Sequence, residues 1–120
     1  MEKKHNFTDN QKAAIVSLII EMINADHKIQ PDEIIESNII NAELGITEEI
    51  FHMGYALDVN YAMEMVRKFS DEDKLLVGCL LVRIIDADDD VKDEEISLFN
   101  HICHQTGIDI LLRDVKLPDE

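Results

Sequence analysis

The chain has 120 residues, which suits one domain built around one core. Its 11 Lys and Arg face 26 Asp and Glu, a formal net charge of −15. This charge excludes proteins that hold nucleic acid through a basic surface, and it favours cations or basic protein surfaces as partners. Trp is absent and only 5% of the residues are aromatic, so the core must be aliphatic.

The first predicted unit, residues 7–46, reads as helix, short loop, helix. Thr8 is a natural N-cap, and the nearly uniform apolar run 13–23 behind it predicts a central helix that is buried on most sides. Pro31 favours the start of a second helix, because proline loses no intrahelical hydrogen bond at the first position. Gly45 is expected to end that helix. We expect its core-facing side to be apolar, formed by Ile34, Ile35, Ile39 and Ile40.

Two shorter helices, residues 47–57 and 58–68, are predicted next, the first of them capped by Thr47. The opening pattern then returns in residues 69–108, with a cap at Ser70 and a glycine stop at Gly107. The apolar positions of its second helix are Ile96, Phe99, Ile102 and Cys103. Residues 110–113 have room for one more short turn, and no strand pattern occurs anywhere.

Residues 7–46 align with residues 69–108 without a gap. The pattern predicts an all-α fold, a compact bundle of six or seven helices that arose by internal duplication and has a pseudo-two-fold axis. We expect a single domain over residues 1–120, with repeat one at 7–46, connecting helices at 47–68 and repeat two at 69–108. Identical pairs include Phe7/Phe69, Lys12/Lys74, Ala25/Ala87, Asp26/Asp88, Glu33/Glu95 and Gly45/Gly107.

The longest apolar stretches, residues 13–23 and 75–85, are each about half a membrane span, and Glu21 and Arg83 interrupt them. No segment near the first residue has the usual form of a signal peptide. Cys79 and Cys103 form no CxxC pair, which fits a reducing compartment. We therefore expect a cytoplasmic protein without direct membrane insertion.

Each repeat turns at an Ala-Asp pair that is followed, seven residues after the Asp, by Glu: Asp26 to Glu33 and Asp88 to Glu95. The second turn is crowded with acids, and a divalent cation would relieve their repulsion. Ca²⁺ and Mg²⁺ take several oxygen ligands. The sequence predicts a cation site formed by Asp86, Asp88, Asp90 and Glu95. Asp26 and Glu33 are weaker candidates, because Lys28 replaces an acid in the first turn.

Structural capping is the alternative interpretation of these acids. Asp26 and Asp88 could accept hydrogen bonds from nearby backbone amides, and each Glu stands where a capping-box residue reaches back to the N-cap. An EF-hand is disfavoured, because Val91 stands where that loop requires Gly and Ser97 stands at the closing Glu position.

The doubled Ala-Asp turn with its spaced Glu, together with Leu-Gly-Ile at residues 44–46, resembles the tellurite-resistance TerB-like family. The resemblance covers residues 7–108. It implies an all-helical fold with internal duplication and a non-enzymatic role in which the acidic turns chelate metal. Members of the family are linked to tellurium and other stress responses.

Catalytic motifs are absent from the sequence: it has no Gly-rich phosphate loop, nucleophile elbow or His-Glu-x-x-His. We therefore expect a non-catalytic domain that binds a divalent cation, Ca²⁺ or Mg²⁺, at its acidic turns. The alternative is a metal-free protein-interaction or adaptor module that presents an acidic face to a basic partner. At helical spacing the methionines and tyrosines of the segment between the repeats are more often core residues, but if they are exposed this segment would offer that partner a groove: Met53, Met63, Met65, Tyr55 and Tyr61.

Overall fold

The structure, a computed structural model, describes residues 6–26, 28, 30–88 and 90–113, and every regular element in these ranges is a helix. The predicted all-α class is confirmed. The expected domain of residues 1–120 also includes segments 1–5 and 114–120, which lie outside the described residues. The helices are α1 (Asp9–Ile23), α2 (Pro31–Leu44), α3 (Glu48–Ala56), α4 (Val59–Arg67), α5 (Asp71–Ala87), α6 (Asp93–Thr106) and α7 (Ile108–Arg113).

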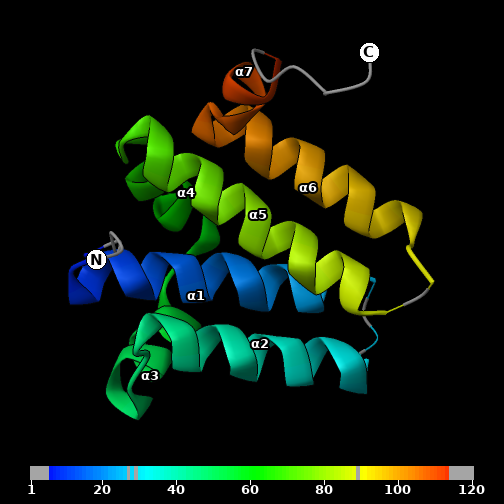
Figure 1. Cartoon of the computed structure of the whole chain (residues 1–120), viewed down its shortest axis with the longest axis horizontal. Coiled ribbons are helices and arrows are strands. Elements are labelled where there is room, and N and C mark those ends of the chain that lie inside the picture. The colour runs from blue at the N-terminus through cyan, green and yellow to red at the C-terminus, as the bar shows by residue number, and fades with distance from the viewer. Residues whose placement is uncertain (1–5, 27, 29, 89, 114–120) are drawn as a thin grey trace, which may run out of the picture.

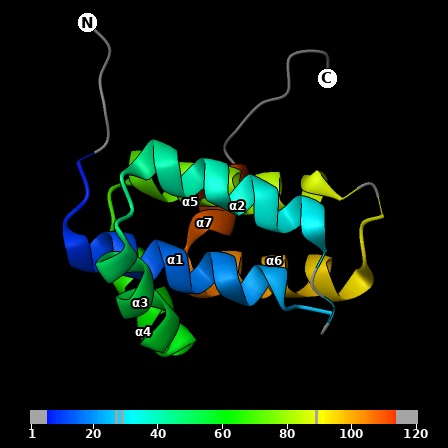
Figure 2. The same ribbon diagram turned by 90° about the horizontal axis from the view of Figure 1, so that it is seen from below.

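The four long helices form two layers, with α2 and α5 in one and α1 and α6 in the other (Figure 2). The short helices α3 and α4 both pack on α1. The α1–α2 turn and the α5–α6 turn lie at the same end of the molecule in both views (Figures 1 and 2). The two acidic segments are therefore brought together by the packing of the long helices.

Local capping begins and ends these helices where the sequence predicts. Three hydroxyl side chains each accept a hydrogen bond of 3.1 Å from the backbone amide three residues further on, at Thr8, Thr47 and Ser70. Gly45 and Gly107 follow α2 and α6 with φ angles of 69° and 86°. These left-handed conformations favour glycine because a Cβ would be strained there.

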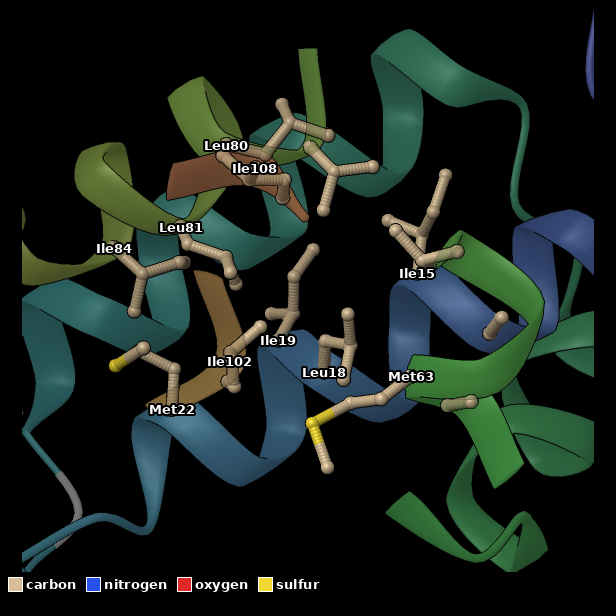
Figure 3. Close-up of a cluster of buried hydrophobic side chains, with 14 of the residues drawn as sticks. Ile15, Leu18, Ile19, Met22, Met63, Leu80, Leu81, Ile84, Ile102 and Ile108 are labelled. Atoms are coloured by element: carbon tan, nitrogen blue, oxygen red, sulfur yellow. The ribbon is translucent and has the colours of Figure 1, made fainter. Parts of the chain in front are cut away.

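The core is aliphatic and lies between α1, α4, α5 and α6, where Leu18, Met63, Leu81 and Ile102 converge (Figure 3). Every residue of α1 from Ala13 to Ile19 is buried, as expected of a central helix. In α5 the expectation is only partly met, because Cys79 and Val82 are exposed. Within the described residues, no helix is both long and apolar enough to cross a membrane.

The second helix of the first unit buries a different face from the one that its apolar residues predict. Three of the four expected core positions of α2 are exposed: Ile34, Ile35 and Ile39 are 38%, 57% and 45% accessible. The buried side of α2 instead carries Glu33, Ser37 and Ile40. In α6 the prediction largely holds, because Ile102 and Cys103 are buried and Phe99 is partly buried, and only Ile96 is exposed. Glu95 and Thr106 are buried on the same helix. Both helices therefore direct a glutamate inward.

Candidate functional site: four carboxyl groups from two turns

The acidic turns of the two halves meet around a single lysine side chain. The Nζ atom of Lys92 lies 3.9 Å from Oδ2 of Asp26 and 3.9 Å from Oδ2 of Asp88. Asp26 follows α1 and Asp88 follows α5, so each half of the chain contributes one aspartate. These distances place the two aspartates in one site.

The two aspartates have the same local geometry. In each, Oδ1 accepts a hydrogen bond from the backbone amide two residues on, from Lys28 at 3.1 Å and from Asp90 at 3.4 Å. This is the turn-capping role that the sequence offers as an alternative. It uses only one oxygen of each carboxylate. The other oxygen faces Lys92, and Oδ2 of Asp26 is buried without a hydrogen-bond partner.

Glu33 and Glu95 occupy the third position of α2 and α6 and are the two buried acids among the described residues, with accessibilities of 0% and 1%. Glu95 forms half of a capping box, because its Oε1 accepts from the backbone amide of Lys92 at 3.2 Å. Apart from Glu95, which is itself an acid, no hydrogen-bond partner reaches the carboxyl oxygens of Glu33 among the described residues. Capping therefore accounts for Glu95, whereas the buried carboxyl group of Glu33 meets only another acid.

The pKa of Glu33 is raised from its ordinary value of 4.5 to about 8. Burial is the largest cause, followed by the side-chain hydrogen bond with Glu95 and the negative charges of Glu95, Asp26 and Asp88. The other three carboxyl groups of this end of the molecule thus act electrostatically on Glu33. In the absence of a cation, Glu33 holds a proton at neutral pH.

Two of the four residues predicted as the main cation site lie in the cluster, and the other two are exposed. Asp88 and Glu95 join Asp26 and Glu33, the pair that the sequence ranks second. Asp86 is exposed on the last turn of α5, and no hydrogen bond or ion pair links it to the other described acids. Asp90 is also exposed, and its Oδ2 lies 3.2 Å from Nζ of Lys92. Sequence reasoning missed the part played by Lys92, because an N-cap lysine carries no spacing signal.

The chemistry of this donor set suits a hard cation. All four side chains are carboxyl groups, whose oxygens are the ligands that Ca²⁺ and Mg²⁺ prefer. Among the described residues, no thiol or imidazole takes part in the interactions of Glu33 with Glu95, Asp26 and Asp88. In the described ranges, no group of three or more His, Cys, Asp or Glu side chains is placed so that it could hold a metal ion as it stands. A bound cation would therefore have to draw these carboxyl groups closer together.

A second feature is an apolar pocket of about 240 Å³ between α1, α2 and α3. Ile20, Ile23 and Phe51 line it, and exposed Ile34 and Tyr55 also border it. Met53 on α3 is also exposed, at 38%. The condition set by the sequence for a partner groove in this segment is therefore met only in part: Met53, Tyr55 and Tyr61 are exposed, whereas Met63 is buried and Met65 partly buried in the core.

Comparison with known proteins defines the fold alone. No family model matches the chain, and no curated protein matches it. A crystal structure of a protein of unknown function from Porphyromonas gingivalis W83 is similar, with a TM-score of 0.76 and 23% sequence identity. The similarity covers 89% of this chain and 84% of the other. The helical arrangement is thus shared with a natural protein, whereas no function comes with it.

Proposed function

We propose that the chain is a non-catalytic, TerB-like helical domain that binds one divalent cation, Ca²⁺ or Mg²⁺, between its two acidic turns. One observation carries this proposal: Glu33 is completely buried, and among the described residues its carboxyl group meets another acid, Glu95, and no cation or N–H donor. Asp26, Asp88 and Glu95 surround it with further negative charge. The ligands proposed are Asp26, Glu33, Asp88 and Glu95.

The energetics of burial support a cation here. An ionised carboxylate inside a protein is costly unless it is paired, and a missing partner for a buried polar group costs about 1–3 kcal/mol. Glu33 reduces that cost by holding a proton, as its raised pKa indicates. A divalent cation would satisfy all four carboxyl groups at once, which a proton on one of them does not.

Calorimetric titration of chelator-treated protein with CaCl₂, MgCl₂, MnCl₂ and ZnCl₂ tests the proposal. We expect saturable binding of one Ca²⁺, Mg²⁺ or Mn²⁺ per chain and a rise in melting temperature, because a ligand that binds only the folded state stabilises it. Glu33→Gln should weaken binding at least tenfold. Asp32→Asn is the matched control, since it removes a charge from the neighbouring exposed position of α2.

Two titration results would contradict the proposed cation site. If none of the four metal salts gives a saturable heat signal or changes the melting temperature, the cation site should be abandoned. Equal losses of affinity in Glu33→Gln and Asp32→Asn would also contradict it, because they would indicate a diffuse acidic surface instead of a specific site.

The second candidate function is recognition of a basic protein segment. The apolar pocket beside exposed Ile34 and Tyr55 favours it, together with the net charge of −15. We propose a cationic amphipathic helix as the occupant, with its apolar face in the pocket. A synthetic Leu/Lys helical peptide should bind, and Ile34→Asp should abolish binding while Glu33→Gln leaves it intact. Binding that is unaffected by Ile34→Asp would exclude the pocket.

A further inference from the structure

Lys92 is the cationic side chain that faces three carboxylates of this end of the molecule. Its Nζ lies 3.2 Å from Oδ2 of Asp90 and 3.9 Å from the inward oxygens of Asp26 and Asp88, and it also donates to the backbone oxygen of Asp90 at 3.3 Å. Its side chain is 27% exposed. The ammonium group thus stands at the open edge of the four-carboxyl site, in contact with both turns.

The backbone at this position does not require a lysine. Lys92 is the N-cap of α6, with φ −97° and ψ 152°. The aligned residue of the first unit, Gln30, is the N-cap of α2, with φ −97° and ψ 128°. Neither side chain accepts a hydrogen bond as a cap. A neutral glutamine therefore fills the equivalent backbone position, and the distinctive property of Lys92 is its positive charge.

The contacts of Lys92 are those of a displaceable counter-ion. Two of its three ion pairs are at 3.9 Å, longer than a charge-assisted hydrogen bond, which is usually about 2.7–2.9 Å. The side chain has a flexible four-carbon stem, so the ammonium group is able to move into solvent. An ammonium group and a divalent cation repel each other and compete for the same oxygens of Asp26 and Asp88.

We propose that Lys92 is a tethered cation that occupies the edge of the acidic site and must be displaced by an incoming divalent ion, so that it sets the affinity of the site. This inference rests on the proposed cation-binding function. Removing one positive charge at this distance is expected to tighten binding of a doubly charged ion on the order of tenfold or more. Lys92 is thus an affinity-setting residue and is not itself a ligand.

Titration of wild type and Lys92→Gln with CaCl₂ and with MnCl₂ tests this inference. Lys92→Gln copies the residue that the first unit already has, so the fold should be retained, and circular dichroism checks that it is. Lys28→Gln is the matched control, because it removes a positive charge from the other turn where the side chain is exposed. We expect at least tenfold tighter binding for Lys92→Gln and less than threefold for Lys28→Gln.

A second measurement follows the lysine directly. Acetylation of wild-type protein by an amine-reactive ester, read by mass spectrometry, should become faster at Lys92 when CaCl₂ is saturating. Lys68, which is exposed on another side of the fold, is the internal reference. A rate at Lys92 that does not change relative to Lys68 would overturn the displacement.

The titrations distinguish a failure of the role proposed for Lys92 from a failure of the cation site itself. If wild type and Lys92→Gln bind the metal ions with the same affinity, the role of Lys92 is wrong and the cation site stands. If neither protein binds Ca²⁺ or Mn²⁺, the site itself is wrong and the role of Lys92 falls with it. Binding by Lys92→Gln alone would support both.

Discussion

At the scale of single residues, Glu33 has two ways to lower the cost of its burial: it can hold a proton or it can meet a cation. Its raised pKa, about 8, means that the folded protein without a cation keeps the proton through neutral pH. Burial from water is the leading cause, and the neighbouring acids add to it. Cation binding and proton release are therefore coupled at this residue.

Stability without a cation should depend on pH through Glu33. The unfolded chain loses this proton near its ordinary pKa of 4.5, whereas the folded chain holds it up to a pKa of about 8. The stabilisation is therefore complete below pH 4.5 and is lost as pH rises towards 8. In urea unfolding of chelator-treated protein, the stability of Glu33→Gln relative to wild type should increase across this range, by at most about 1.4 kcal/mol per pH unit.

The comparison with Glu33→Gln is needed because the other acids of this chain also titrate on unfolding. Subtracting the two stabilities at each pH isolates the contribution of Glu33. A difference in the free energy of unfolding that stays constant from pH 5 to pH 8 would contradict the raised pKa.

Release of the Glu33 proton on metal binding should be measurable by calorimetry. At pH 7, binding of Mn²⁺ to wild type should release up to one proton, because Glu33 must ionise to become a ligand. The apparent binding enthalpy should then vary with the ionisation enthalpy of the buffer. Glu33→Gln has no such proton, so an equal buffer dependence in the residual binding of that variant would count against the assignment.

At the scale of helices, the sequence predicts where each element begins and ends more accurately than which face it buries. Thr8, Ser70 and Gly45 act locally, through their own side chains or φ angles, so their effects are readable from the chain. The face of α2 is decided by packing against α1 and α5, which the sequence does not display. Periodicity favoured Ile35 and Ile39 as core residues, yet both are exposed.

The contact between α1 and α3 depends on a glycine. A Cβ placed on Gly54 would lie 2.6 Å from Cβ of Val16 and 2.7 Å from the backbone oxygen of Ala13, too close for either atom. Gly54→Ala should therefore force the helices apart and lower the free energy of unfolding by roughly 1–3 kcal/mol. Urea unfolding followed by circular dichroism measures the change.

Gly78→Ala provides the control for this prediction. A Cβ on Gly78 would meet Cγ2 of Ile108 at 3.4 Å, an ordinary contact. Because alanine is the better helix former, this variant should keep the wild-type stability within about 1 kcal/mol. If Gly54→Ala proves as stable as Gly78→Ala, the close approach of α1 and α3 is not a structural requirement.

At the scale of the whole molecule, the site exists because both halves fold against each other. The rings of Phe7 and Phe69, which precede α1 and α5, lie 5.5 Å apart and are largely buried. At the other end of the long helices lie the α1–α2 and α5–α6 turns (Figure 2). There each half contributes one aspartate and one glutamate to the site. The matched Asp-to-Glu spacing is visible in the sequence. The meeting of the two pairs is not, because it depends on how the long helices pack.

A shared site differs in stoichiometry and in mutational pattern from a site within one turn. We expect one cation per chain, and we expect Asp26→Asn and Asp88→Asn to weaken binding by similar factors, each at least tenfold. Calorimetric titration gives both quantities. If Asp86→Asn or Asp90→Asn had the large effect while Asp26→Asn had none, the ion would instead lie within the second turn, as the sequence alone suggests.

The most direct test of the cation site is the anomalous diffraction of a crystal soaked in MnCl₂. We expect one peak between the two turns, with carboxyl oxygens of Asp26, Glu33, Asp88 and Glu95 within about 2.0–2.6 Å of it and the ammonium group of Lys92 moved away. No peak between the turns, or a peak bound only by Asp86 and Asp90, would contradict it.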